Sequence, residues 1–113
     1  MKFKLEGKTA LVCGGSSGIG LAIAKLLDEH RNINIILVSN NHKKLELAKE
    51  GFPSSKNIKT IRCDLSNQKE VEDLILLLQK QKIKVDILIN NSGGPKAGDF
   101  FQTEISDWQT ALQ

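Results

Sequence analysis

Four glycines lie close together near the start of the chain, in the segment Cys13–Gly20 (CGGSSGIG), and three of them, Gly14, Gly18 and Gly20, have the spacing Gly-x-x-x-Gly-x-Gly. The apolar run Thr9–Val12 precedes this segment and predicts a buried strand, and Leu21–Leu27 predicts a helix after it. A helix begins with N–H groups that have no partner inside it and with a partial positive charge, so a pyrophosphate is stabilised there. We therefore expect this strand, turn and helix to form a phosphate-binding site.

Each of these three glycines suits a different requirement of such a turn. Gly14 would let the chain turn tightly, and Gly18 has no Cβ that would block the ligand. Gly20 would let the helix pack close to the strand. Two serine hydroxyls between the glycines can donate hydrogen bonds to phosphate. The expected phosphate-binding residues are Gly14, Ser16, Ser17, Gly18, Ile19 and Gly20.

Two later segments carry polar residues where a predicted strand ends. Asp64 and Leu65 follow the strand Ile58–Cys63, and the run Asn90-Asn91-Ser92-Gly93 follows the strand Val85–Asn90. Asp64 could instead cap the approach to the next helix. The two Asn side chains could equally tie loop backbone together or contact a ligand, and both interpretations stay open here.

These three segments together resemble the short-chain dehydrogenase/reductase family. In that family the turn usually reads Thr-Gly-x-x-x-Gly-x-Gly, and Cys13 stands where Thr is usual. Asp64-Leu65 resembles the family's adenine-contacting Asp, and Asn90 to Gly93 resembles its Asn-Asn-Ala-Gly turn beside the cofactor ribose, with Ser92 in place of Ala. The resemblance runs from about Leu5 to the last residue and implies a nicotinamide dinucleotide, NADP or NAD, as cofactor.

The choice between the two cofactors depends on the end of the second predicted strand. By the resemblance, Ser39 occupies the position where NAD-preferring relatives carry Asp, and Asn40 the position where NADP-preferring relatives often carry Arg. Neither charge is present, so nothing repels a 2′-phosphate, and Ser39 and Asn40 can hydrogen-bond it. The basic residues His42–Lys44 add positive charge nearby or are simply solvated. We expect a modest preference for NADP.

The catalytic residues of the family cannot be placed in this sequence. By the resemblance, a Tyr, a Lys four residues later and a Ser act on the substrate, but the chain contains no tyrosine. We therefore expect the cofactor-binding half of an oxidoreductase that transfers hydride between nicotinamide and a carbonyl or alcohol, inactive by itself. Asn91–Pro95 looks like the corresponding run of 3-oxoacyl-carrier-protein reductases. The alternatives are a standalone dinucleotide-binding module, acting as sensor or scaffold, and a phosphate-binding α/β domain unrelated to nicotinamide.

The elements that must position these residues alternate between strand and helix. Continuous apolar runs such as Ile35–Val38 are typical of parallel strands buried on both faces. Right-handed crossovers then give a Rossmann-type doubly wound parallel sheet of about four strands in the order 3-2-1-4, with ligand at the carboxyl ends. The expected strands are Thr9–Cys13, Ile33–Ser39, Ile58–Cys63 and Val85–Asn90, and the expected helices are Gly18–His30, His42–Glu50 and Gln68–Lys80.

Further expectations concern the ends of these elements and the segments after them. Gly51 and Pro53 would end the second helix, and Asn67 with Glu70 forms a capping box for the third. A loop over Asn91–Thr103 and a helix from Ser106 would follow. The strand Val85–Asn90 would be an incomplete edge of the sheet.

Length and composition narrow the class of protein. The chain has 113 residues, of which 40% are hydrophobic and 26% charged, which is typical of a single soluble domain over residues 1–113, truncated relative to the family. A net charge of +3 from scattered lysines does not indicate nucleic acid, and no apolar run suggests a membrane span. We expect a cytoplasmic protein without a metal site, and a homo-oligomer in its full-length form. Cys13 and Cys63 should be roughly 9–10 Å apart across one strand, too far for a disulfide.

Overall fold

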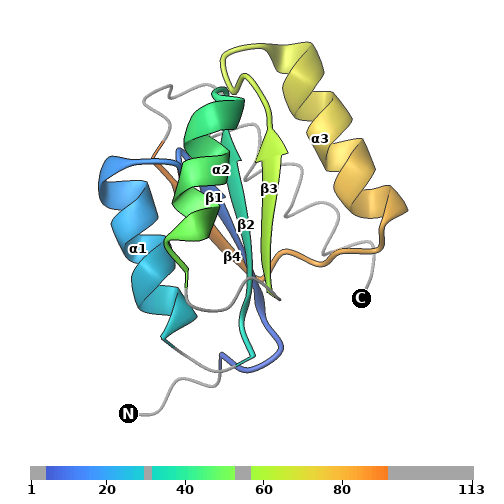
Figure 1. The fold of residues 1–113 in the computed structure, drawn as a ribbon. Coiled ribbons are helices and arrows are strands. Elements are labelled where there is room, and N and C mark those ends of the chain that lie inside the picture. Colours follow the sequence, from blue (N-terminus) through green and yellow to red (C-terminus); the bar gives the residue numbers. More distant parts are fainter. Residues whose placement is uncertain (1–4, 30–31, 53–56, 92–113) are drawn as a thin grey trace.

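A computed structural model describes residues 5–29, 32–52 and 57–91. Within these residues, strands and helices alternate from Thr9 to Asn90 (Figure 1). The elements are β1 (Thr9–Cys13), α1 (Gly18–Asp28), β2 (Asn34–Ser39), α2 (His42–Glu50), β3 (Ile58–Arg62), α3 (Gln68–Lys80) and β4 (Ile87–Asn90).

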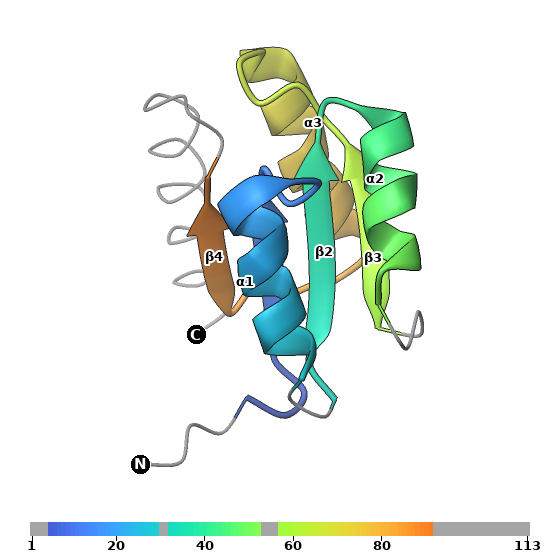
Figure 2. The same ribbon diagram turned by 60° about the vertical axis from the view of Figure 1, so that its left-hand side comes forward.

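The four strands form one parallel sheet in the order β3-β2-β1-β4, which confirms the predicted order. Figure 2 shows β3 and β4 at opposite edges of this sheet. The register aligns the carboxyl ends, because Cys13 pairs with both Val38 and Asn90, and Ser39 pairs with Arg62. Residues that follow the four strands therefore meet along one edge of the molecule.

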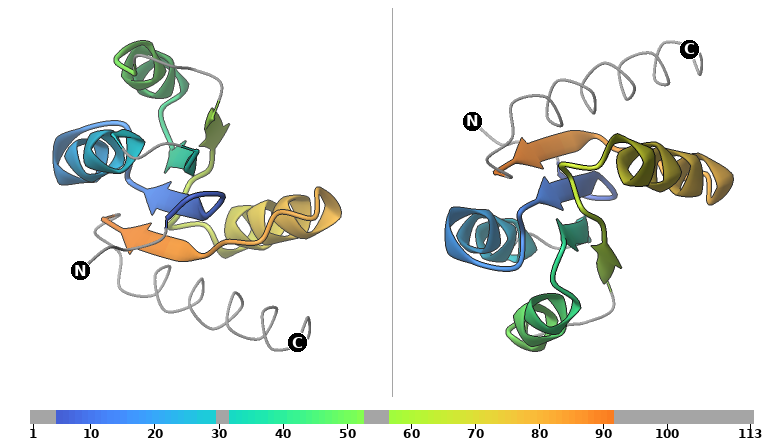
Figure 3. Two further views of the ribbon diagram at one scale, coloured as in Figure 1. Left: turned by 90° about the horizontal axis from the view of Figure 1, so that it is seen from below. Right: turned by 90° about the horizontal axis from the view of Figure 1, so that it is seen from above.

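Helices cover both faces of the sheet, with α1 and α2 on one face and α3 on the other (Figure 3). Side chains alternate along each strand, so neighbouring residues enter different cores. Toward α1 and α2 the core contains Ala10, Val12, Ile35, Leu37, Leu45 and Phe52. Toward α3 it contains Leu11, Ile36, Val38, Leu74, Ile75 and Leu78. The central strands β1 and β2 are buried on both faces, as the apolar run in β2 predicts.

Several element boundaries differ from the predicted ones by one or two residues. Helix α1 ends at Asp28, and the predicted last residue, His30, lies outside the described residues. Strand β4 begins at Ile87 instead of Val85. The reason is that Asp86 bonds to Thr9 partly through its side chain and not through the backbone alone, as a strand residue would. Its backbone N–H donates to the Thr9 carbonyl oxygen at 2.9 Å, while its carboxylate accepts from the Thr9 N–H at 2.9 Å. The predicted loop and helix after Asn91 also lie outside the described residues.

Both cysteine thiols are free, and both are buried on the α3 side of the sheet. Burial raises the pKa of Cys13 from 9.0 to about 12 and that of Cys63 to about 11. Both groups are therefore neutral thiols near neutral pH. Separately, no helix in the described residues is long and apolar enough to cross a membrane.

Candidate functional site at the carboxyl ends of the strands

The glycine-rich turn between β1 and α1 is fastened to the end of β2. The carbonyl oxygen of Val38 accepts hydrogen bonds from the backbone N–H groups of Gly14 and Gly15, at 2.8 and 3.2 Å. Gly14 has φ +76° and Gly18 has φ +59°, both in the left-handed region that favours glycine. Gly14, in the turn, and Gly18, the first residue of α1, thus adopt backbone conformations that other residues would adopt only with strain.

Two glycines of this turn have different surroundings. A Cβ at Gly20 would overlap the carbonyl oxygen of Gly14, so the first turn of α1 can approach the end of β1 this closely only with glycine there. A Cβ at Gly18 would instead meet nothing within 4 Å. The space outside Gly18 is thus open on the side where a ligand would pass the helix N-terminus.

The N-terminus of α1 differs from those of the other described helices. Asn41 caps α2 by accepting from the N–H of Lys44 at 3.0 Å, and Asn67 caps α3 by accepting from the N–H of Glu70 at 3.2 Å. At α1 the N-cap residue is Ser17, whose side chain makes no capping bond, and the first turn carries no acidic residue. The positive end of α1 is therefore available to an anion. Ile19, in this first turn, is 68% exposed.

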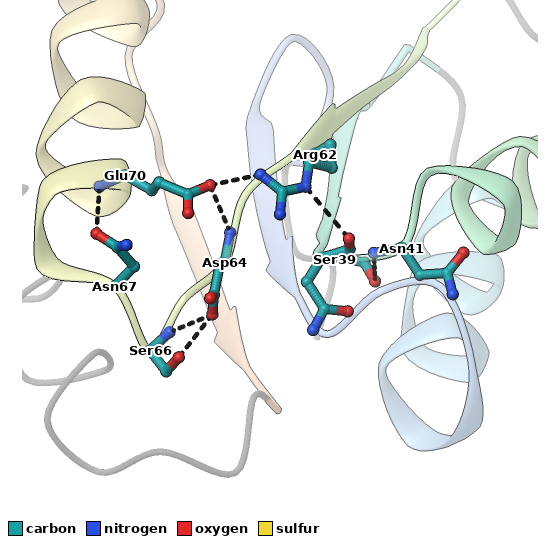
Figure 4. Close-up of polar contacts among 8 residues, drawn as sticks. Ser39, Asn41, Arg62, Asp64, Ser66, Asn67 and Glu70 are labelled. Atoms are coloured by element: carbon teal, nitrogen blue, oxygen red, sulfur yellow. Dashed lines mark hydrogen bonds and ion pairs between the residues drawn. The ribbon is translucent and has the colours of Figure 1, made fainter.

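Ser39 joins the turn to the end of β2. Its hydroxyl oxygen accepts a hydrogen bond from the Ser16 hydroxyl at 2.9 Å. It also accepts one from the Asn41 N–H at 3.3 Å (Figure 4). Ser39 is only 8% exposed, whereas Asn40 beside it is exposed. Ser39 thus lies beneath the surface of the site and holds the turn, and Asn40 faces solvent.

Asp64 comes two residues after β3 and is held by a local turn. Its Oδ1 accepts from the Ser66 hydroxyl at 2.6 Å and from the Ser66 N–H at 3.0 Å. These hydrogen bonds lower the pKa of Asp64, so the carboxylate is ionised at neutral pH. The structural role left open in the sequence is present, because Asp64 shapes the approach to α3 and its carbonyl oxygen accepts from the Asn67 N–H at 3.0 Å.

The predicted capping box at α3 is only half formed. Asn67 accepts from the Glu70 N–H as expected, but the Glu70 carboxylate does not return to Asn67. Glu70 Oε1 accepts instead from the Asp64 N–H at 3.3 Å and from Arg62 Nη1 at 2.6 Å. The guanidinium of Arg62 is a stronger partner for the carboxylate than a backbone amide, which explains the difference.

Sequence reasoning missed Arg62, the last residue of β3. Its Nε donates to the carbonyl oxygen of Asn40 at 3.3 Å, and its Nη1 donates to Glu70 (Figure 4). The ladder pairing of Ser39 with Arg62 places this cation beside the end of β2. A signal was available, since an Arg at the end of a strand adjacent to β2 reaches the same edge as Ser39 and Asn40.

The end of β4 reaches the same edge. The N–H of Asn91 donates to the carbonyl oxygen of Cys13 at 2.9 Å, which joins the end of β4 to the start of the glycine-rich turn. Asn90 pairs with Cys13 in the ladder. Ser92 and Gly93, the other two residues predicted for this turn, lie outside the described residues.

A cavity in the described residues lies elsewhere. It measures about 480 Å³ and lies at the amino ends of the strands, lined by Lys8, Thr9, Asn34, Lys59, Lys84 and Asp86 among others. Ligands of open parallel sheets bind at the carboxyl ends, where the helix N-termini point. The glycine-rich turn, and not this cavity, is therefore the candidate site.

Known proteins resemble this chain in sequence over almost its full length. The family model described as short chain dehydrogenase matches residues 8–113. Nodulation protein G of Rhizobium sp. (strain N33) is 39% identical over 112 residues, which cover 98% of this chain and 44% of the relative. An uncharacterised oxidoreductase of Staphylococcus aureus (strain USA300) is 32% identical over 108 residues, 96% of this chain and 46% of the relative. The chain thus spans a little under half the length of these relatives.

Solved structures resemble the fold as well. L-sorbose reductase from Gluconobacter frateurii, in complex with NADPH and L-sorbose, has a TM-score of 0.70 and 31% identity, covering 83% of this chain and 36% of the reductase. A short chain dehydrogenase from Bacillus anthracis has a TM-score of 0.71 and 27% identity, covering 80% of this chain and 38% of that protein.

Proposed function

The chain belongs to the short-chain dehydrogenase family, and from this premise we propose that its glycine-rich turn binds the pyrophosphate of a nicotinamide dinucleotide. The observation that carries the proposal is the N-terminus of α1, which has no side-chain cap and lies beside the open space at Gly18. A pyrophosphate there would accept from backbone N–H groups and from the Ser17 hydroxyl. The Ser16 hydroxyl would donate to it after giving up its hydrogen bond to Ser39.

The remaining cofactor contacts that we propose lie along the same edge. The ionised carboxylate of Asp64, beside Leu65, would accept a hydrogen bond from the adenine amino group. The end of β2, at Ser39 and Asn40, would face the adenine ribose. The end of β4, with Asn90 to Gly93, would border the other ribose.

We propose a modest preference for NADP over NAD. The described end of β2 carries no carboxylate that would repel a 2′-phosphate, since Ser39 and Asn40 are both neutral. L-sorbose reductase, to which the chain is similar, is described in complex with NADPH. Both observations support NADP without excluding NAD as a weaker ligand.

The activity of the full-length protein would be hydride transfer between nicotinamide and a carbonyl or alcohol substrate. When bound, the nicotinamide supplies the hydride donor or acceptor. Residues 1–113 contain no tyrosine, so no proton-transfer step is assigned to them. A 3-oxoacyl thioester is the first substrate to test, because Asn91–Pro95 resembles the run in 3-oxoacyl-carrier-protein reductases. We further propose a cytoplasmic homo-oligomer.

Calorimetric titration of the full-length gene product with NADPH and NADH tests the cofactor proposal. Saturable binding of either one supports it, and failure of both to bind contradicts it. The reading frame after Gln113 tests the catalytic part, since a Tyr-x-x-x-Lys motif is expected there. Oxidation of NADPH in the presence of 3-oxoacyl thioesters and simple ketones then defines the substrate class.

A further inference from the structure

We propose that Arg62 binds the 2′-phosphate of NADP from the end of β3, and so takes the part that an arginine at the end of β2 would play. The inference rests on the proposed function, because it assumes that the adenine ribose lies at the end of β2. It names a residue that would determine cofactor specificity and that sequence reasoning missed.

The position of Arg62 is the first support. Its backbone pairs with Ser39 across the ladder, and its Nε donates to the carbonyl oxygen of Asn40 at 3.3 Å. An arginine that accommodates a 2′-phosphate must lie near the end of the second strand. At that end Asn40 is neutral, and the neighbouring strand brings a guanidinium to its carbonyl oxygen.

The second support is that the guanidinium is held in place and yet partly exposed. Nε bonds to Asn40, Nη1 bonds to Glu70, and the side chain remains 50% exposed. A guanidinium has five N–H donors in one plane, so two bonds to the protein leave donors for a phosphate. Because its orientation is fixed before binding, little side-chain entropy remains to be lost when the phosphate binds.

Glu70 sets the strength of this site. Its Oε1 lies 2.6 Å from Arg62 Nη1 and neutralises part of the guanidinium charge. An exposed Arg beside a carboxylate attracts a dianion less strongly than a free Arg does. This geometry predicts a moderate NADP preference, and it makes Glu70 the residue through which that preference can be changed.

The test compares cofactor affinities, measured by calorimetry, in the full-length gene product and its variants. Arg62→Gln should weaken NADP⁺ binding by roughly three- to thirtyfold, between the effect of an exposed ion pair and that of a charge-assisted hydrogen bond. NAD⁺ affinity should change less than about twofold, because NAD⁺ has no 2′-phosphate. The NADP⁺ affinity of the variant should also fall less steeply with added KCl.

Two further variants separate this role from a structural one. Lys59→Gln removes the same charge from the exposed, opposite end of β3 and should leave both affinities unchanged. Glu70→Gln removes the counter-charge but keeps an oxygen acceptor for the Asp64 N–H, and it should strengthen NADP⁺ binding alone.

Three results would overturn the inference. If Arg62→Gln weakens NADP⁺ and NAD⁺ by the same factor, the residue only supports the fold. If it weakens neither, the 2′-phosphate lies elsewhere. If the unmodified protein binds neither dinucleotide, the proposed function fails and the inference fails with it.

Discussion

Ser39 holds the glycine-rich turn in place through a single hydroxyl that is itself buried. Its oxygen accepts from Ser16 in the glycine-rich turn and from the Asn41 N–H at the start of α2, and the residue is 8% exposed. The sequence indicates a direct hydrogen bond from Ser39 to the 2′-phosphate. The structure makes it first a positioning residue, which shares its hydroxyl with two neighbouring segments.

Replacing Ser39 with Asp should turn the cofactor preference toward NAD. A carboxylate can still accept from the Ser16 hydroxyl and the Asn41 N–H, so we expect the fold to persist. Its charge would repel a 2′-phosphate, and the preference should shift by about 1–3 kcal/mol. Parallel titrations of NADH and NADPH measure this shift. Ser39→Asn is the uncharged control, and an equal shift in that variant would exclude charge as the cause.

Two glycine substitutions should have different consequences. Gly18→Val places a branched side chain in the open space beside α1, so dinucleotide binding should be lost while the circular dichroism spectrum stays close to that of the parent. The φ of +59° adds a strain of about 1–2 kcal/mol. In Gly20→Ala the new methyl group would clash with the Gly14 backbone, so this variant should have a lower melting temperature than the parent protein. Unchanged NADPH affinity in a folded Gly18→Val protein would contradict the assigned role of the turn.

The buried thiols give a prediction that depends on pH. Their pKa values, about 12 for Cys13 and about 11 for Cys63, lie above the 9.0 of an ordinary thiol, so each favours the folded state below pH 9. This contribution is lost as the pH rises toward 11 and 12, because the unfolded chain releases these protons first. Native protein at pH 8 should therefore react very slowly with a thiol reagent, as read by mass spectrometry of the two peptides. Rapid labelling of Cys13 would show that it is accessible.

At the scale of single residues, the sequence predicts the parts of the site that depend on local chain geometry. The roles of Gly14 and Gly20 follow from their spacing between a strand and a helix, and the structure agrees. Arg62 and Glu70 could not be assigned in this way, because their contact joins the end of β3 to the first turn of α3. The partner of a long charged side chain depends on how the elements pack, and no local sequence pattern encodes that packing.

At the scale of elements, the three described helices differ in how their N-termini are satisfied. Asn41 and Asn67 cap α2 and α3, so those helices need no ligand at their N-termini. Helix α1 begins at Gly18, and its N-cap residue, Ser17, makes no side-chain capping bond. The first N–H groups of α1 therefore depend on water or a ligand for their hydrogen bonds.

Ser17→Asp should stabilise helix α1 and weaken dinucleotide binding. Ser17 has the extended backbone of an N-cap residue, with φ −162° and ψ 170°, so a carboxylate there can accept from the first N–H groups of α1. Helix α1 should gain about 0.5–1 kcal/mol, and dinucleotide affinity should fall because the carboxylate competes with the pyrophosphate. Urea unfolding and calorimetry measure the two effects. Asn67→Asp is the control, since it adds the same charge at α3 and should leave the affinity unchanged.

Element types were predictable because hydrophobic periodicity differs between strands and helices. The bounds of α2 and α3 agree with the predicted ones, since each helix has an Asn cap at its start. The bounds of β2, β3 and β4 shift by one or two residues, because ladder pairing sets the ends of a strand. Asp86 illustrates this, since its side chain bonds to Thr9 where a ladder residue would use its backbone.

At the scale of the molecule, the edge strand β4 is less buried than the central strand β1. Residues 10–13 of β1 are completely buried, whereas Ile87, Leu88 and Ile89 of β4 are only half-buried. Within the described residues, β4 pairs with β1 alone. In the described part of the chain, Ile87, Leu88 and Ile89 pair with no strand on their other side, and an apolar edge of this kind is a template for another strand.

A polypeptide of residues 1–113 produced alone should therefore self-associate. The relatives are about twice as long as this chain, so in the full-length protein we expect further residues to cover the outer side of β4. Without them, the half-buried Ile87–Ile89 segment would pair edge to edge with a second copy or aggregate. Analytical ultracentrifugation over a range of concentrations should show average mass rising with concentration, while the full-length gene product, as the control, should keep one fixed mass. A monomer of residues 1–113 that is independent of concentration and unfolds cooperatively would show that the four strands form a complete sheet on their own.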